Sequence, residues 1–211
     1  MSTIAIIGGT GYTGTNVAGE AVSRGHQVVS FSRKAPAEPV DGVRYEYGTG
    51  AEGARVVPGT DVVVATLSPR GDSLGTLPAT YQELARAAVE NHARLVVVGG
   101  FSSLRPAEGA PRFAEGDVPD QFRAEALEMD SIREWLSTSA PDGLDWLFVS
   151  PAGAYGAHAA GTRTGEYRVG GEVALFDADG KSELSGADFA VALLDEIEKP
   201  AHHREHISVA Y

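Results

Sequence analysis

The sequence opens with a short apolar run that leads directly into a glycine-rich turn. Residues 3–7 (Thr-Ile-Ala-Ile-Ile) predict a buried strand, and residues 8–14 carry glycines at both Gly-x-Gly-x-x-Gly and Gly-x-x-Gly-x-x-Gly spacing. A helix pattern follows and ends at Arg24-Gly25, where a basic residue and a glycine are typical of a helix C-terminus. A second apolar run spans residues 27–31. A strand, glycine turn, helix and strand in this order form a dinucleotide-binding fingerprint.

Each glycine of the turn has a physical role in such a site. Gly8 or Gly9 allows the tight turn, with a positive φ. Gly11 has no Cβ, so a pyrophosphate can approach the backbone, and Gly14 lets the helix pack closely on the sheet. The free N–H groups of the first helical turn then face the phosphates.

The end of the second predicted strand indicates which dinucleotide is bound. NAD sites usually carry an acidic residue there, which holds the ribose 2′-hydroxyl. No acid occurs from Gln27 to Ala37, and Ser32, Arg33 and Lys34 stand at this position instead. Cationic groups suit a 2′-phosphate, so we expect NADPH to be preferred over NADH. The alternative is a solvated basic turn.

Composition limits the classes of protein and partner. With 211 residues, one domain over 1–211 is expected, in which residues from about 150 to 211 complete the acceptor side. A net charge of −12 argues against nucleic acid and anionic membranes as partners. The chain has no cysteine, and its apolar opening is too short for a signal peptide or a membrane span. We expect a soluble cytoplasmic protein, monomeric or homodimeric, that acts on a small molecule.

Strand and helix patterns alternate along the rest of the chain. Strands are predicted at 43–47, 61–67, 95–98, 144–149 and 206–209, and helices at 77–92, 122–137 and 187–199. Residues 104–121 are irregular, and residues 161–169 are predicted as a hairpin arm. Apolar strands separated by helices predict an α/β fold with a doubly wound parallel sheet, Rossmann-like, in a single domain.

Ligands of such folds bind at the carboxyl ends of the strands. These ends are rich in small residues that let a flat cofactor lie against the backbone. The predicted cofactor-binding residues are Gly8, Thr10, Gly11, Tyr12, Thr13, Gly14, Ser32, Arg33, Lys34, Thr66, Leu67, Ser68, Gly99, Gly100, Phe101, Pro151, Ala152 and Gly153. We expect residues 66–68 to lie under the adenosine ribose and pyrophosphate, 99–101 to face the nicotinamide, and 151–153 to hold its carboxamide.

The sequence lacks the Tyr-x-x-x-Lys dyad of short-chain dehydrogenases, because none of the seven tyrosines precedes a lysine at that spacing. Hydride transfer to a flavin or quinone has less need of a proton donor, since such acceptors are electron-poor and solvent can supply the proton. Ser102, Ser103, Tyr155 and His158 are the candidate catalytic residues, and a structural role for each is equally consistent with the sequence.

Two polar motifs resemble metal sites but are better explained otherwise. His202-His203-x-x-His206 follows a helix that Pro200 stops, and we interpret it as a solvated turn. Asp177-Ala178-Asp179-Gly180 resembles the start of a calcium loop, but Asp188 stands where a glutamate is needed, so a β-turn is expected. No metal site is predicted.

Several stretches resemble the atypical short-chain dehydrogenase/reductase group, and within it the NADH-flavin reductase family related to biliverdin reductase B. They are 4–14, 94–104 (with Val-Val-Val-Gly-Gly), 144–156 (with Asp-Trp-Leu-Phe-Val-Ser-Pro), 164–171 (Thr-Gly-Glu-Tyr-Arg-Val-Gly-Gly) and 185–211. The resemblance implies a Rossmann-like NAD(P)H-binding domain that reduces flavin or a similar acceptor. It implies cofactor contacts for Gly8, Gly11, Gly14, Arg33, Leu67, Gly99 and Pro151. The chain departs from the family at 48–50, where Gly-Thr-Gly replaces Gly-Asp, and at Phe122-Arg123.

We therefore expect an oxidoreductase, an NAD(P)H-dependent reductase that takes NADPH and transfers hydride to a planar acceptor, with flavin as a candidate substrate. The missing dyad leaves two alternatives open. One is a non-catalytic redox sensor or regulator that binds NADP(H). The other is an isomerase or epimerase of the same fold.

Overall fold

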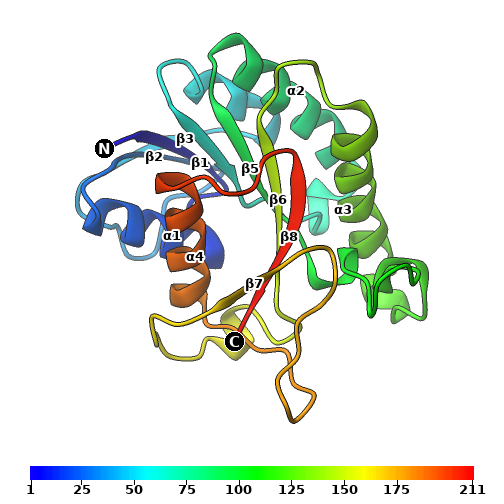
Figure 1. Cartoon of the computed structure of the whole chain (residues 1–211). Helices are drawn as coiled ribbons and strands as arrows, with labels where there is room; N and C mark the ends of the chain where they lie inside the picture. Colours follow the sequence, from blue (N-terminus) through cyan, green and yellow to red (C-terminus); the bar gives the residue numbers. More distant parts are fainter.

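The computed structural model describes residues 1–211 and contains one eight-stranded sheet (Figure 1). The strands are β1 (Thr3–Ile7), β2 (Gln27–Ser32), β3 (Val43–Tyr47), β4 (Val62–Ala65), β5 (Arg94–Val98), β6 (Trp146–Pro151), β7 (Arg168–Gly170) and β8 (Glu205–Ala210). Their order is β3-β2-β1-β4-β5-β6-β8-β7, and all neighbours are parallel except β7 and β8. The doubly wound Rossmann-like α/β fold is confirmed. The strand order reverses between β1 and β4, where such sheets bind ligands.

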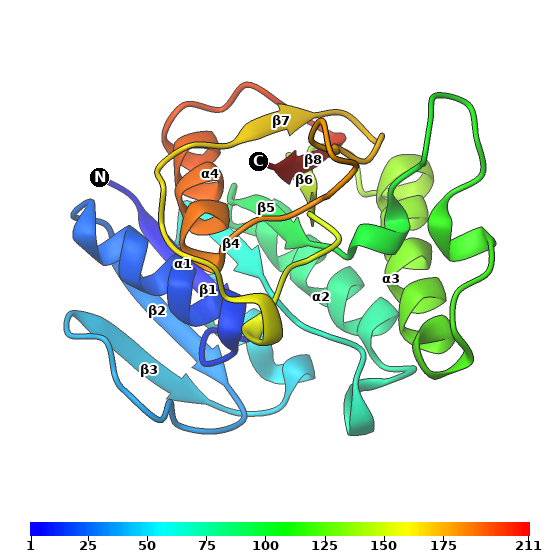
Figure 2. The same ribbon diagram turned by 90° about the horizontal axis from the view of Figure 1, so that it is seen from below.

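Two pairs of helices cover the sheet. They are α1 (Tyr12–Ser23) with α4 (Gly186–Glu198) on one face, and α2 (Leu77–Glu90) with α3 (Asp120–Ser139) on the other. Figure 2 shows the two pairs on opposite sides of the strands. Because both faces are covered, the central strands are apolar throughout rather than alternating. No helix combines the length and the apolar character that a membrane span requires.

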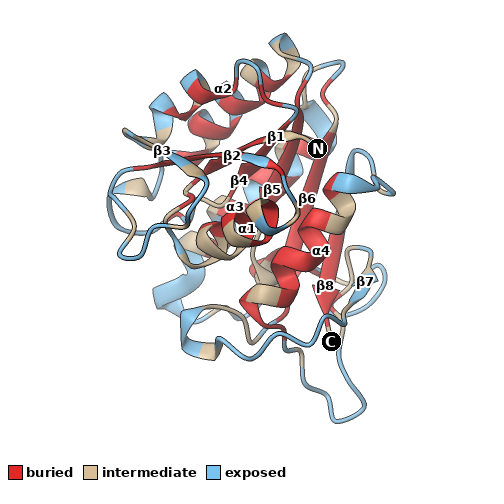
Figure 3. Ribbon diagram, turned by 90° about the vertical axis from the view of Figure 1, so that its left-hand side faces the viewer, coloured by how far each residue is buried: buried red, intermediate tan, exposed pale blue.

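The core consists of two layers that sandwich the sheet (Figure 3). Along β1, Ile4 and Ile6 pack in the layer of α1 and α4, whereas Ala5 and Ile7 pack in the layer of α2. This alternation follows from the two-residue period of a strand. The strands are thereby held rigidly, and their carboxyl ends provide a fixed edge for a binding site.

Most predicted elements occur near their expected bounds, and the differences have local causes. The helix predicted at 122–137 extends to Asp120–Ser139 and begins directly after Pro119, a residue suited to a helix start. The strand predicted at 144–149 starts at Trp146 and continues through Pro151. Leu144 instead belongs to a turn, in which its N–H donates to the Pro141 carbonyl. Of the predicted hairpin arm, only residues 168–170 form a strand, antiparallel to β8.

The irregular segment 104–121 is tied to the sheet edge rather than extended into solvent. Arg105 forms a parallel bridge with Val173, and Phe113 donates its N–H to the Leu104 carbonyl at 3.0 Å. A short 3-10 helix, η4, spans Phe113–Glu115. The segment therefore brings the chain between β5 and α3 next to the chain that follows β7.

Candidate functional site

The glycine turn between β1 and α1 has the close packing that its sequence predicts. Gly8 has φ +87°, a conformation that favours glycine, and its N–H donates to the Phe31 carbonyl at 2.8 Å. A Cβ on Gly14 would lie 2.5 Å from the Gly8 carbonyl oxygen. The N–H groups of residues 12–14 have no hydrogen-bond partner in the chain, and the Gly11 N-cap provides no side-chain cap. The start of α1 therefore offers free donors and its positive dipole end to an anion.

A cavity of about 1020 Å³ lies in front of this turn, at the point where the strand order reverses. Its lining brings together predicted residues from three strand ends: Gly8, Thr10, Gly11, Ser32, Arg33, Lys34, Thr66, Leu67 and Ser68. It also includes residues that the sequence analysis did not select, among them the 48–51 turn after β3, Arg70, and Thr80 and Glu83 of α2. The cavity therefore lies where doubly wound folds bind nucleotides, and it is large enough to take a small ligand.

The basic turn after β2 faces this cavity. Arg33 and Lys34 are both exposed, line the cavity, and take part in none of the ion pairs of the structure. Ser32 is buried, and its Oγ accepts a hydrogen bond from the Thr10 N–H at 3.0 Å. Ser32 thus already holds the glycine turn in place, while the two cations remain available to a ligand.

Thr66 supports the same turn from β4. Its hydroxyl is 3.1 Å from the carbonyl oxygens of Ile7 and of Gly8, to which it donates. A Cβ on Gly8 would come within 2.8 Å of this hydroxyl oxygen. The close approach explains why a glycine must follow β1 at this position.

The predicted nicotinamide-side residues lie at the next strand ends, outside this cavity. Gly99, Gly100 and Phe101 follow β5, and Pro151, Ala152 and Gly153 end or follow β6. The Ser150 hydroxyl donates to the Gly100 carbonyl at 2.8 Å and so joins the two strand ends. A Cβ on Gly99 would overlap the Phe148 ring, so only glycine fits at this position.

The aromatic and hydroxyl groups at the start of α1 contact the later loops. The Thr13 hydroxyl pairs with the Tyr155 hydroxyl at 2.8 Å, and the rings of Tyr12 and Tyr155 meet edge to face at 5.6 Å. The Tyr12 hydroxyl accepts from the Gly186 N–H at 3.0 Å, at the start of α4. Tyr12 and Thr13 thus connect the start of α1 to the later loops and do not line the cavity.

The four candidate catalytic residues do not form one hydrogen-bonded group. Ser103 is buried, its hydroxyl has no partner, and its carbonyl accepts from Arg112. Ser102 is half-buried and His158 is exposed. Burial raises the pKa of Tyr155, the Thr13 hydrogen bond opposes this, and Tyr12 raises it further, so its hydroxyl stays protonated.

A buried polar chain behind the nicotinamide side was missed by the sequence analysis. His206 lies in β8, as the strand predicted at 206–209 implies, but its side chain is not solvated: its Nε2 is 2.9 Å from the Ser150 Oγ. Its Nδ1 faces the Arg112 guanidinium at 3.5 Å, and Arg112 in turn pairs with Glu172. Since Arg112 can only donate, His206 accepts at Nδ1, donates at Nε2 to Ser150, and Ser150 donates to Gly100.

Burial and the nearby Arg112 and Arg133 guanidiniums lower the pKa of His206 to about 3. His206 is therefore neutral at physiological pH, as its role of accepting at one ring nitrogen and donating at the other requires. The strand predicted at 206–209 was the available signal: its two-residue period places His206 on the face opposite to Ile207 and Val209, and helices cover both faces of such a sheet. Its neighbours His202 and His203 instead pair with Glu196 and Asp145.

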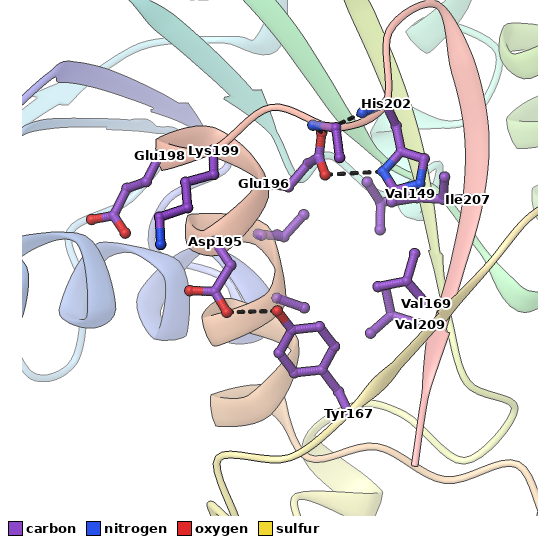
Figure 4. Close-up of a pocket in the computed structure, with 13 residues that line it drawn as sticks. Val149, Tyr167, Val169, Asp195, Glu196, Glu198, Lys199, His202, Ile207 and Val209 are labelled. Carbon is purple, nitrogen blue, oxygen red and sulfur yellow. Dashed lines mark hydrogen bonds and ion pairs between the residues drawn. The ribbon is translucent and has the colours of Figure 1, made fainter.

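A second cavity, of about 380 Å³, lies between α4 and strands β6 to β8 (Figure 4). Its acidic side chains already have partners: Asp195 accepts from the Tyr167 hydroxyl at 2.5 Å, and Glu196 pairs with His202 at 3.0 Å. None of the predicted site residues lines it. The cavity at the glycine turn, with its free cations and free N–H groups, is therefore the better candidate for an anionic ligand.

The fold, the glycine turn and the basic cavity define a doubly wound nucleotide-binding protein. Comparison with known families narrows this class: the chain belongs to the NAD(P)H-binding family, whose model matches residues 8–200. An uncharacterized protein of Bacillus subtilis is 31% identical over 218 residues, covering 98% of this chain and 97% of its own length.

Solved structures of similar proteins agree with this family. A provisionally named NADH-flavin reductase from Streptococcus pneumoniae has 29% identity and a TM-score of 0.87, covering 100% of this chain and 99% of its own. A provisionally named epimerase from Bacteroides thetaiotaomicron has 28% identity and a TM-score of 0.85, with coverages of 99% and 96%. The expected resemblance to reductases of the atypical short-chain group is confirmed, and epimerase-like proteins are also among the neighbours.

Proposed function

We propose that this protein is an NADP(H)-dependent reductase that transfers hydride to a small planar acceptor such as a flavin or quinone. The observation that carries the cofactor choice is the pair of exposed, unpaired cations, Arg33 and Lys34, in the same cavity as the glycine turn. Their charge is complementary to a 2′-phosphate, and no acidic side chain stands beside them at the end of β2 to hold a 2′-hydroxyl.

The residues of the cavity fit the adenosine half of NADPH. The free N–H groups at the start of α1 would hold the pyrophosphate, because Gly11 and Gly14 leave the backbone open to it. Leu67 and Ser68, which line the cavity after β4, would contact the adenosine ribose. Thr66 and Ser32 bind no ligand in this account and instead hold the turn that presents the donors.

The loops after β5 and β6 position the reacting end. NADPH supplies a hydride from its reduced nicotinamide ring to the acceptor. Ser150 fixes the Gly100 carbonyl, and Pro151 to Gly153 provide main-chain groups for the carboxamide. Ser102, half-buried in the loop after β5, is the candidate polar side chain on this side. Residues from about 150 to 211 complete the acceptor side within a single domain.

The reaction does not call for a strong acid from the protein. The sequence has no Tyr-x-x-x-Lys dyad, and the Tyr155 hydroxyl is engaged by Thr13. An electron-poor acceptor gains its proton from solvent, so that catalysis rests on the stacking and orientation of the two reactants.

The test is to mix purified protein with NADPH and FMN, FAD or a quinone, and to follow the nicotinamide absorbance band. The proposal expects acceptor-dependent loss of this absorbance, faster with NADPH than with NADH. NADPH binding without turnover on any acceptor would instead support the second candidate, a redox sensor. The hydrogen bond between the half-buried Tyr155 hydroxyl and Thr13 is the observation that favours that second candidate.

A further inference from the structure

Three aromatic rings meet at the carboxyl edge of the sheet, beside the predicted nicotinamide position. Phe101 stacks on Phe113 with centroids 4.8 Å apart and an interplanar angle of 22°, and meets Phe176 edge to face at 6.3 Å. We call these three residues the aromatic cluster. They come from three separate segments, after β5, in η4 and after β7, which lie toward the lower end of the sheet in Figure 1.

The aromatic cluster is not a closed part of the core. Phe176 is 40% exposed, and Phe101 and Phe113 are half-buried. None of them belongs to the two core layers of the sheet. A fold gains little from leaving a large ring open to water, so the exposed Phe176 ring beside two half-buried rings at a ligand-binding edge indicates a surface for a flat apolar partner.

The backbone that follows β6 packs directly against the cluster. Gly153 follows β6 and is exposed, and a Cβ there would lie 3.5 Å from the Phe101 ring. The cluster is therefore continuous with the 151–153 backbone, to which the proposed function assigns the nicotinamide carboxamide. A ring system stacked on the cluster would lie next to the hydride donor.

The charges on the same segments favour an acceptor that carries no phosphate. Exposed acidic residues without an ion-pair partner are Glu108, Glu115, Asp117, Asp177 and Asp179. Among the cations, Arg105 and Arg112 are engaged by Glu172, and Arg168 donates to the carbonyl oxygens of Phe176 and Tyr211. Lys181 is the cation there that forms neither an ion pair nor a side-chain hydrogen bond. A phosphate near this edge would therefore meet net repulsion, because Lys181 is the one unpaired cation beside five unpaired acidic residues.

We infer that the aromatic cluster binds the acceptor, and that the acceptor is an uncharged planar ring system, of the quinone or riboflavin type, rather than a flavin nucleotide. This inference rests on the proposed reductase function. In the reaction, the acceptor gains a hydride from NADPH and one proton from solvent. NADPH is oxidised to NADP⁺, and the acceptor is reduced by two electrons.

Binding is measured first, without turnover, by equilibrium dialysis of the whole protein against riboflavin and FMN. We expect riboflavin to bind roughly fivefold more tightly than FMN at low salt, and the gap to narrow at high salt because the repulsion is screened. In the double variant Glu115→Lys/Asp179→Lys, the difference between riboflavin and FMN affinity should be smaller at low salt as well, because two repelling carboxylates are replaced by cations. Equal or tighter binding of FMN at low salt would overturn the inference.

The ring itself is tested with Phe176→Ala, Phe176→Trp and the control Leu127→Ala, an exposed apolar residue of α3. Phe176→Ala should weaken riboflavin binding, and raise the KM for menadione, by roughly two- to tenfold. Phe176→Trp should keep the wild-type riboflavin affinity and KM for menadione, and Leu127→Ala should change neither quantity. Unchanged binding and KM in Phe176→Ala, with wild-type folding by circular dichroism, would contradict the assignment.

Failure of the reductase function and failure of the aromatic cluster as acceptor site give different results. If wild-type protein binds riboflavin through Phe176 but oxidises no NADPH with any acceptor, the proposed reductase function fails and the binding surface stands. If NADPH is oxidised with menadione and Phe176→Ala has no effect on its KM, the reductase function stands and the aromatic cluster is not the acceptor site.

Discussion

The Ser150 hydroxyl donates to the Gly100 carbonyl at 2.8 Å and thereby joins the carboxyl ends of β5 and β6. The two residues are far apart in sequence, and the hydroxyl is oriented by the neutral His206, which donates to it. Because Gly100 begins the loop that carries Phe101, this hydrogen bond positions both the predicted nicotinamide side and the aromatic cluster.

Removing this hydroxyl should affect turnover more than cofactor affinity. We expect Ser150→Ala to lower stability by about 1 kcal/mol, the usual value of one hydrogen bond, and to lower kcat. Affinity for an adenosine fragment of NADPH that carries the 2′-phosphate should be unchanged. Ser208→Ala is the matched control, since Ser208 is a buried serine that donates to Val173. An equal loss of kcat in both variants would refute a positioning role for Ser150.

Alanine substitutions at two glycines of α1 test two different effects on stability: close packing at Gly14 and helix propensity at Gly19. A Cβ on Gly14 would lie 2.5 Å from backbone atoms of Gly8 and Gly9, whereas nothing lies within 4 Å of one on Gly19. We expect Gly14→Ala to destabilise the protein by about 1–3 kcal/mol and to weaken NADPH binding. Gly19→Ala should stabilise it by about 0.5–1 kcal/mol. Urea unfolding measures both, and a Gly14→Ala protein as stable as wild type would contradict the packing account.

The repeating patterns of the sequence were enough to predict the sheet, its helices and the glycine turn. Local signals determine these features: apolar runs, a basic turn after β2 and glycines at fixed spacing. The Arg112–His206–Ser150 chain was not predicted, because its members lie on separate elements and meet only when β8 pairs with β6. The same holds for the aromatic cluster, since the contact of Phe101 with Phe176 depends on how residues 171–183 return to the sheet edge.

Arg33 should control the choice between NADPH and NADH. We expect Arg33→Asp to reduce NADPH affinity about tenfold relative to NADH, because it replaces a cation of the cavity with a repelling carboxylate. The control Arg44→Asp makes the same change in charge at an exposed arginine of β3 that does not line the cavity. Dissociation constants measured by nicotinamide fluorescence check this. An unchanged ratio in Arg33→Asp would show that the basic turn is only a solvated surface.

The buried His206 should make stability depend on pH. Its pKa in the folded protein is lowered to about 3, so between this value and the ordinary value of about 6.5 the unfolded chain binds a proton that the folded one does not. Stability therefore falls as pH decreases through this window, by up to about 1.4 kcal/mol per pH unit from this residue.

Urea unfolding at pH values across this window measures the slope. We expect it to be shallower in His206→Gln than in wild type, and unchanged in His158→Gln, which replaces an exposed histidine. Parallel slopes for wild type and His206→Gln would mean that His206 titrates normally in the folded protein.

Acceptor-dependent oxidation of NADPH tests the central claim most directly. Purified protein is mixed with NADPH and either menadione or riboflavin, and the nicotinamide absorbance is followed against mixtures that lack protein or acceptor. The account predicts a loss of absorbance that requires both, and that is slower when NADH replaces NADPH. Tight NADPH binding with no oxidation by any quinone or flavin would contradict it.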